Sequence, residues 1–278
     1  MAQPSRAIIV AGNYRCGTTW LAEMLTRALP KHALLFEPIR QHYPTMGTAV
    51  GDLWRPYITA ENSAGATLLE RTFRSVFDGT FVNANTVAHT DKEAVLAADA
   101  LVVKMVRGLC SLRWMADTFK PRHTFVVMRH PCMAIASQFR VGAVPGTPKQ
   151  RWQLDSFFDH HPEIQPFLPK TDAAWFAIYW AMGYYVALST PRPHPWTLLK
   201  YEELVGNPEQ VQASVFGELG EFPEGLEELV KRPSFQTKRP TPGNHVWVPG
   251  TSPLSTQQAS EVWGVIERFP GLEEHYAP

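Results

Sequence analysis

Short apolar runs alternate along the chain with longer stretches of helical periodicity. Runs of strand length lie at residues 7–12, 32–38, 100–106, 123–128 and 196–201. Apolar positions recur at helical spacing in residues 18–29, 112–119, 131–139, 173–188, 208–219 and 255–269. This alternation favours an α/β fold with a parallel sheet flanked by helices. Residues 41–95 show no clear pattern, and residues 232–255 are rich in Pro, Gly and Ser.

The chain is long enough to bury a large core. Its 278 residues, of which 45% are hydrophobic, lie near the upper size of one hydrophobic unit, so we expect a single domain across residues 1–278. The 26 basic residues balance 26 acidic residues, and no net field favours a nucleic acid or an anionic membrane. Any anion site must therefore be local.

The three cysteines, Cys16, Cys110 and Cys132, cannot all pair, and their spacing resembles neither a zinc nor a disulfide framework. The histidines are scattered, so we expect no metal site. The first apolar run is too short for a signal peptide, and no run approaches the roughly 18 residues of a membrane span. We therefore expect a reduced, cytoplasmic protein.

The stretch GNYRCGTTW nearly matches a nucleotide-phosphate loop. Gly12 and Gly17 have the spacing of G-x-x-x-x-G-K-[ST], but Thr18 stands where the lysine belongs. A loop between a strand and a helix directs backbone N–H groups and the positive end of the helix dipole at one point. Arg15 adds a permanent charge, and Thr18 and Thr19 add hydroxyl donors. The stretch predicts an anion site, and the alternative is an ordinary strand-to-helix turn.

Within this stretch, YRCGTTWL resembles the 5'-phosphosulfate loop of the sulfotransferases that use 3'-phosphoadenosine 5'-phosphosulfate (PAPS). The common form is [RK]-S-G-T-T-x-L, and here Cys16 replaces the serine. The resemblance implies a P-loop-like fold and transfer of a sulfuryl group from PAPS to a hydroxyl or amine without magnesium. It also implies that the donor is bound by a run of loop residues: Arg15, Cys16, Gly17, Thr18, Thr19 and Trp20.

A second stretch, FVVMRHPCMAIASQF, is similar to the family's 3'-phosphate motif. Arg129 ends a strand, and Ser137 follows at the spacing of V-x-R-x-P-x-x-x-x-x-S. An arginine at the carboxyl end of a strand and a serine two helical turns later can face one group. The resemblance implies that both residues hold the 3'-phosphate. Without it, Arg129 would be interpreted as a surface ion-pair arginine.

Two further segments match the family less specifically. LLKYEELVGNPEQ resembles the late segment Y-E-D-L-x-x-x-P, which implies that Tyr201 lies near the adenine. KRPTPGNHVW resembles the flap R-K-G-x-x-G-x-W over the nucleotide, although a proline replaces the first glycine. The resemblance assigns Arg239 to the 3'-phosphate. The motif-bearing core thus covers residues 7–215, and residues 232–255 are the expected flap.

Glu37 is the candidate general base. It ends the strand ALLFEP, so it would stand at the carboxyl edge of a parallel sheet, in a crevice away from the core. The segment resembles L-F-E-P of carbohydrate sulfotransferases of the N-acetylglucosamine-6-O type, where the glutamate is regarded as the base. The aryl and steroid branch uses a histidine in K-T-H-L-P, where this chain has Arg107. Alternatively, Glu37 pairs with Arg40, and His42 is a second candidate on the substrate side.

Lys104 interrupts the apolar strand VVKMVR. A lysine in such a strand is unfavourable unless its ammonium reaches an anion or the surface. The family often has a lysine near the sulfuryl group on the corresponding strand, so the resemblance implies that Lys104 and Arg15 assist the transfer. The alternative is an edge lysine that extends to solvent.

These features together predict a PAPS-dependent sulfotransferase whose acceptor is a hydroxyl of a small molecule, a glycan or a glycolipid. Residues 41–95 and 140–170 would form the acceptor wall. A magnesium-dependent kinase or ATPase would share the fold, but Thr18 in the lysine position and the lack of a clear Asp-ended strand disfavour it. A non-catalytic nucleotide-binding protein is the third possibility.

Overall fold

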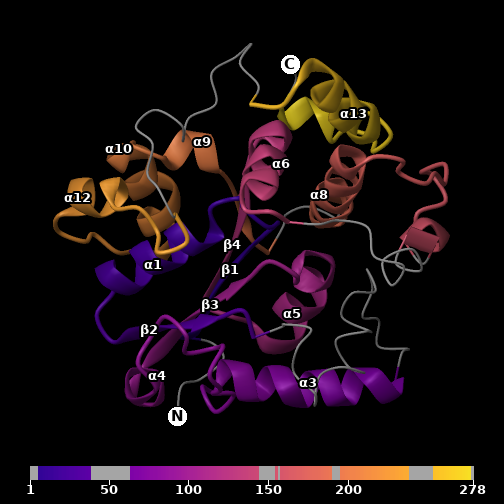
Figure 1. Cartoon of the computed structure of the whole chain (residues 1–278). Coiled ribbons are helices and arrows are strands. Elements are labelled where there is room, and N and C mark those ends of the chain that lie inside the picture. Colours follow the sequence, from indigo (N-terminus) through magenta and orange to yellow (C-terminus); the bar gives the residue numbers. More distant parts are fainter. Residues whose placement is uncertain are drawn as a thin grey trace.

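The computed structural model describes residues 6–38, 63–143, 154–155, 157–189, 195–237 and 253–276, and of residues 63–69 only the backbone. At its centre lies a five-stranded sheet with the order β2-β3-β1-β4-β5, and all its strand pairs are parallel (Figure 1). The strands are β1 (Ile8–Gly12), β2 (His32–Phe36), β3 (Ala100–Met105), β4 (His123–Met128) and β5 (Thr197–Lys200). The predicted α/β fold with a parallel sheet flanked by helices is confirmed.

The helices and helical turns of the described residues are α1 (Thr18–Ala28), α3 (Ser63–Phe77), α4 (Lys92–Ala97), η2 (Leu109–Ser111), α5 (Leu112–Phe119), α6 (Pro131–Arg140), α8 (Asp172–Ser189), α9 (Tyr201–Leu204), α10 (Pro208–Val211), η3 (Gln212–Phe216), α11 (Gly217–Leu219), α12 (Leu226–Lys231), α13 (Thr256–Ile266) and η4 (Glu273–His275). The predicted helix at 208–219 contains a π-helical turn, η3. Helix α3 lies within residues 41–95, where the sequence shows no clear pattern, and α4 begins there.

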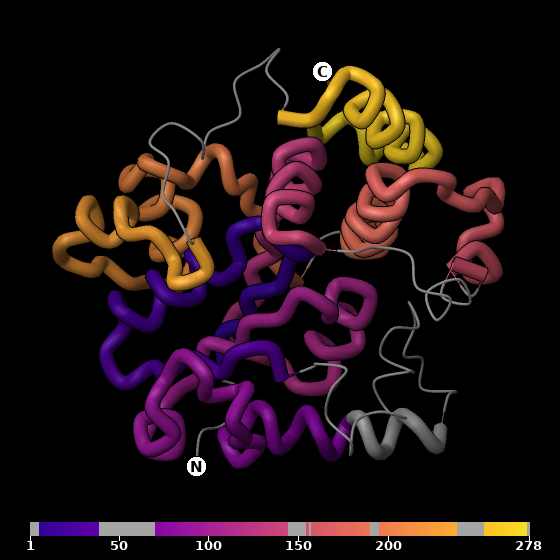
Figure 2. The backbone as a smooth tube through the Cα atoms, in the orientation of Figure 1, coloured from indigo at the N-terminus to yellow at the C-terminus, as the bar shows by residue number. Residues whose placement is uncertain are grey.

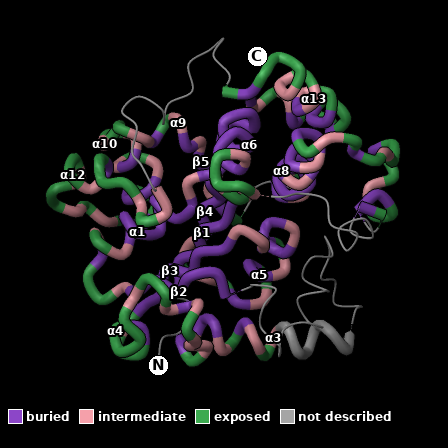
Figure 3. The backbone as a smooth tube through the Cα atoms, viewed as in Figure 1, coloured by how far each residue is buried: buried purple, intermediate pink, exposed green. Residues whose placement is uncertain are grey.

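Two hydrophobic clusters cover the two faces of the sheet. Ile8 and Val10 of β1 belong to the cluster formed with α1, α10 and α12. Ile9 and Ala11 belong to the cluster formed with α5, α6, α8 and α13. Since successive strand side chains point to opposite faces, this alternation makes a buried strand apolar throughout. Figure 3 shows the strands buried between the two helical layers, and Figure 2 shows α13 beside α8.

Helix α8 is apolar on all sides, and it packs against α13, η2 and α6. Within the described part of the chain, no helix combines the length and apolar character needed to cross a membrane.

Candidate functional site

The residues that the sequence singles out follow the carboxyl ends of the strands. Residues 13–17 follow β1, Glu37 follows β2, Arg107 lies just after β3, Arg129 follows β4 and Tyr201 follows β5. Because the strands are parallel, these ends lie at one edge of the sheet. The fold therefore brings the separate sequence motifs together.

The loop after β1 contains two left-handed residues. Arg15 has a φ of 68° and Gly17 a φ of 95°. A Cβ atom at Gly17 would lie 2.2 Å from Cδ2 of Tyr201, so the loop packs directly against this ring. Gly17 is also the N-cap of α1 and contributes no capping side chain to the first N–H groups of the helix. Such N–H groups can bind an anion.

Gly17→Ala should lower the free energy of unfolding by about 2–4 kcal/mol, because the new methyl group adds backbone strain and meets Tyr201. Urea titration measures the loss. Gly206→Ala is the matched control, since Gly206 has a φ of 73° but no heavy atom beyond its chain neighbours within 4 Å of the position that a Cβ atom would take. It should lose only about 1 kcal/mol. Equal losses in the two variants would contradict the close packing of the loop on Tyr201.

Arg15 and Ser137, which come from different motifs, meet at the sheet edge. Arg15 Nε donates a hydrogen bond to Ser137 Oγ at 3.0 Å, and Arg129 Nη1 donates to the Arg15 carbonyl oxygen at 3.2 Å. Gln138 Nε2 donates to the Tyr14 carbonyl oxygen at 3.3 Å. The loop after β1 is therefore joined to the segment from Arg129 to Gln138, whose bonded residues lie 114 to 124 positions away in the sequence.

Positive charge accumulates around Arg15. Burial lowers the pKa of Arg15, and the nearby charges of Arg129 and Arg140 lower it further, while Tyr14 opposes the shift. Guanidinium groups that repel one another in a partly buried site are stabilised by an anion between them. The cluster therefore suits a ligand with more than one negative charge.

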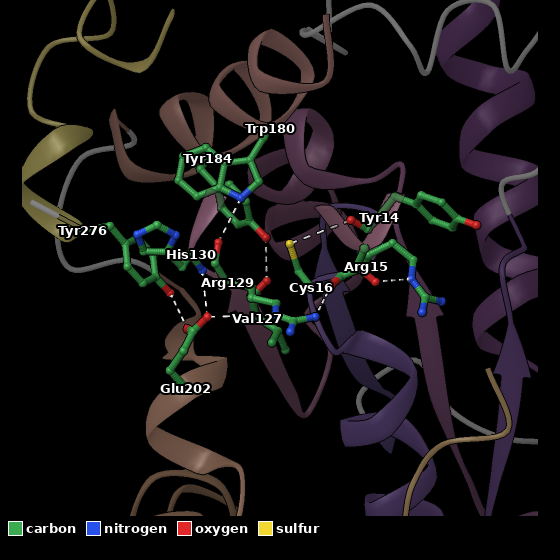
Figure 4. A network of polar contacts seen from close by, with 11 residues as sticks. Tyr14, Arg15, Cys16, Val127, Arg129, His130, Trp180, Tyr184, Glu202 and Tyr276 are labelled. Atoms are coloured by element: carbon green, nitrogen blue, oxygen red, sulfur yellow. Dashed lines mark hydrogen bonds and ion pairs between the residues drawn. The ribbon is translucent and has the colours of Figure 1, made fainter. Parts of the chain in front are cut away.

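Arg129 is buried and is held from several sides (Figure 4). Its guanidinium lies over the Tyr201 ring, 4.8 Å from the centroid, and its Nε lies 3.9 Å from Glu202 Oε1. Trp180 Nε1 donates a hydrogen bond to the Arg129 carbonyl oxygen at 3.1 Å. The alternative of a surface ion-pair arginine is wrong, because the Arg129 side chain is only 8% exposed.

His130 should make stability depend on pH. Burial, followed by the charge of Arg129, lowers the pKa of His130 to about 4, whereas an imidazole in the unfolded chain titrates near about 6.5. Below about pH 6.5 the unfolded chain therefore binds the proton first, and stability falls until the folded histidine also titrates.

The His130→Phe variant keeps an aromatic ring against Trp263 and Tyr276. The free energy of unfolding of the native chain, relative to this variant, should fall by about 2–3 kcal/mol between about pH 7.5 and about pH 4.5. Denaturant titrations at both pH values measure it. Parallel pH profiles for the two proteins would contradict the buried, neutral histidine.

Glu37 and Lys104 form a buried ion pair. Lys104 Nζ donates a hydrogen bond to Glu37 Oε1. The side chain of Glu37 is 6% exposed, and that of Lys104 is 2% exposed. The Val106 N–H donates to Glu37 Oε2 at 3.3 Å, and Arg107 Nη1 lies 3.7 Å from the same oxygen. Burial lowers the pKa of Lys104, and Glu37 opposes the shift. Lys104 is therefore not an edge lysine that extends to solvent.

This pair corrects the expectation that Glu37 stands in an open crevice and does not support the core. Glu37 is buried, and replacing either member of the pair leaves a buried charge without its partner. Its described ionic partners are Lys104 and Arg107, whereas the proposed partner Arg40 lies outside the described residues.

Aromatic rings pack beside the ion pair. Lys104 Nζ lies 4.6 Å from the centroid of Phe36, whose ring contacts those of His89 and Phe235. Thr19 Oγ1 donates a hydrogen bond to Gln236 Oε1 at 2.9 Å. The described beginning of the expected flap therefore contacts both β2 and the start of α1.

The loop residues predicted to bind the donor include several with buried side chains, among them Cys16, Thr18 and Trp20. The side chains of Cys16 and Trp20 turn into the protein, where burial raises the pKa of Cys16 to about 11 and Trp20 Nε1 donates to the Val230 carbonyl oxygen at 3.4 Å. Only their backbones can contact a ligand in this arrangement. Thr18 is buried at the start of α1.

Two predicted residues, Arg239 and His42, lie outside the part of the chain that the structure describes. In the described part, no group of three or more His, Cys, Asp or Glu side chains is arranged to hold a metal ion.

The sequence interpretation missed Tyr184 and Glu202. The Tyr184 hydroxyl donates to the Val127 carbonyl oxygen at 2.6 Å (Figure 4). It also accepts a hydrogen bond from the Asn13 N–H at 3.0 Å. The apolar pattern of α8 conceals this role, because it marks the whole helix as core. Glu202 is visible in the sequence next to Tyr201, and a carboxylate directly after a strand was the signal that could have identified it.

Comparison with known proteins yields likenesses to solved structures alone. No family model matches the sequence, and no curated protein matches it. A solved structure that it resembles is the sulfotransferase domain from the Synechococcus PCC 7002 olefin synthase, with 18% sequence identity over 97% of this chain and 96% of that chain, and a TM-score of 0.47. A likeness of this size does not assign an activity to the chain.

Proposed function

We propose that the chain is a sulfotransferase that moves a sulfuryl group from PAPS to an acceptor hydroxyl. The observation that carries the proposal is the cluster of Arg15, Ser137 and Arg129, in which two hydrogen bonds join the phosphosulfate-loop motif to the 3'-phosphate motif. PAPS carries a 3'-phosphate and a 5'-phosphosulfate, so it needs two anion sites held at a fixed separation. The cluster supports such a pair of sites at one sheet edge.

The residues present fit this donor. The start of α1 offers N–H groups without a capping side chain. Arg15 in the loop and Arg129, which donates to the Arg15 carbonyl oxygen, supply permanent charges. Tyr201 packs on Gly17 and Arg129, so it is placed to support the nucleotide through both. Arg239 remains a proposed further contact to the 3'-phosphate.

In the proposed reaction, Glu37 accepts the proton of the acceptor hydroxyl while the acceptor oxygen bonds to sulfur. The bond between sulfur and the 5'-phosphate oxygen breaks, which leaves 3'-phosphoadenosine 5'-phosphate. Lys104 and Arg15 stabilise the charge on the departing oxygen. In this structure the Lys104 ammonium donates a hydrogen bond to Glu37. The ammonium must therefore also interact with PAPS before the Glu37 carboxylate can accept the proton.

The assignment of Glu37 as the base makes the chain similar to the carbohydrate-type branch. We therefore propose a glycan, a glycolipid or a small hydroxylated molecule as the acceptor. Arg107 supports this branch, because it approaches Glu37 from the position where the aryl and steroid branch has its histidine.

The proposal is tested by incubating the protein with radiolabelled PAPS and fractionated extract of the source cells. Label should pass to an acceptor, and the rate should survive excess EDTA because arginine side chains and helix N–H groups take the place of a metal ion. Loss of activity in EDTA that Mg²⁺ restores would favour the kinase or ATPase. Binding of 3'-phosphoadenosine 5'-phosphate without transfer to any acceptor would favour a non-catalytic protein.

A further inference from the structure

Glu202 connects the proposed 3'-phosphate site to the last described turn of the chain. Its partly buried carboxylate accepts a hydrogen bond from the His130 N–H at 2.9 Å through Oε1 and one from the Tyr276 hydroxyl at 3.0 Å through Oε2. Oε1 also lies 3.9 Å from Arg129 Nε (Figure 4). Three segments that are distant in the sequence therefore converge on one carboxylate.

The contact between Glu202 and Arg129 is electrostatic and has no fixed direction. At 3.9 Å it is an ion pair, and the buried Arg129 Nε has no hydrogen-bond partner among the described residues. The position of the guanidinium thus depends on where the carboxylate stands. Its remaining contacts, with the Tyr201 ring and the Arg15 carbonyl oxygen, fix it only from the other sides.

Tyr276 fixes the position of that carboxylate. Its ring packs near those of His130 and Trp180, with centroid separations of 5.4 Å and 6.3 Å. Its hydroxyl thereby reaches Oε2 of Glu202, whereas the His130 N–H contacts Oε1. Without this donor, Oε2 would be left without its hydrogen bond, and the carboxylate would turn further toward the cation beside it.

We propose that Glu202 and Tyr276 are positioning residues that set the affinity of Arg129 for a phosphate group. A carboxylate held by two hydrogen-bond donors orients the guanidinium through charge attraction and leaves it available to the ligand. A carboxylate that has lost Tyr276 competes with the ligand for the same charge. This inference rests on the proposed function, because it takes the 3'-phosphate as the ligand of Arg129.

The test is calorimetric binding of adenosine 3',5'-bisphosphate and of adenosine 5'-phosphate, which lacks the 3'-phosphate. Tyr276→Phe should weaken binding of the bisphosphate by about 3- to 10-fold, the loss expected for one hydrogen bond. Binding of the monophosphate should change by less than about two-fold, because Arg129 does not contact its single phosphate in this proposal. A general structural defect would weaken both nucleotides.

Two variants make the comparison specific. Tyr185→Phe is the matched control, because the Tyr185 hydroxyl donates to Glu163 at 2.8 Å, away from Arg129; it should leave the ratio of the two affinities unchanged. In the Glu202→Gln background, Tyr276→Phe should change the ratio by less than about two-fold, since no carboxylate remains to orient.

An unchanged ratio in Tyr276→Phe, or the same change in both backgrounds, would overturn the inference. Arg129→Ala in the same assay tests the proposed function separately. If Arg129→Ala removes the preference for the bisphosphate and Tyr276→Phe does not, only the positioning role fails. If Arg129→Ala leaves the preference intact, the assignment of Arg129 to the 3'-phosphate fails.

Discussion

Glu37→Gln should lower the rate constant for sulfuryl transfer by about 10²- to 10⁴-fold, because the amide keeps the size of the side chain but cannot accept the acceptor's proton. Nucleotide affinity should stay within a few-fold, since the contacts of Glu37 are to Lys104, Val106 and Arg107 and not to the Arg129 cluster. Single-turnover transfer from labelled PAPS at saturating acceptor measures the rate constant. Near-native turnover would end the assignment of Glu37 as the base.

The buried ion pair adds a stability effect that must be separated from the rate effect. Glu37→Gln leaves the Lys104 ammonium buried without its carboxylate, which should lower the free energy of unfolding by about 3–5 kcal/mol. The double variant Glu37→Gln, Lys104→Met removes both charges and should recover most of that loss. Its transfer rate should remain low. Both proposed catalytic groups are missing in the double variant, so one that regains both stability and rate would show that neither Glu37 nor Lys104 takes part in the transfer.

His42→Ala is the control for the alternative base. It should keep most of the native rate if Glu37 accepts the proton. A collapse of the rate in His42→Ala, with Glu37→Gln still active, would assign the base to the histidine.

Arg129→Ala should weaken binding of the 3'-phosphorylated nucleotide by about 2–4 kcal/mol, because a phosphate loses a charged donor in a site shielded from water. The analogue without the 3'-phosphate should bind almost as before. Isothermal titration of both nucleotides measures the difference. Equal losses for the two nucleotides would show that Arg129 does not contact that phosphate.

Arg122→Ala is the matched control for Arg129→Ala. Arg122 immediately precedes β4, at the opposite edge of the sheet, and donates hydrogen bonds to the Leu219 carbonyl oxygen and to Glu221. Its replacement should leave both nucleotide affinities unchanged. Arg129→Ala should also reduce stability, because it leaves the partly buried Glu202 carboxylate without its cation.

Local sequence patterns predicted most of the secondary structure. The apolar runs at 7–12, 100–106 and 123–128 correspond to β1, β3 and β4 because buried parallel strands are apolar on both faces. Helices α3 and α4 escaped this pattern. Gly65 and Thr67 in the first half of α3 have low helix propensity, and α4 is only six residues long.

The sequence by itself also determined which residues stand at the carboxyl ends of strands, since each motif includes its own strand. Arg15, Glu37, Arg129 and Tyr201 could therefore be assigned to one sheet edge before their neighbours were known. Arg239 stays a prediction.

Only the tertiary structure decided which of these residues touch. Strand β2 pairs with β3 in a register that sets Phe36 opposite Lys104, and this pairing brings the Lys104 ammonium to Glu37. In the same way, β4 pairs with β5 so that Met128 lies opposite Lys200, which places Glu202 beside Arg129. Local periodicity specifies a strand but not its neighbour or register, because pairing between parallel strands depends on contacts far apart in the chain.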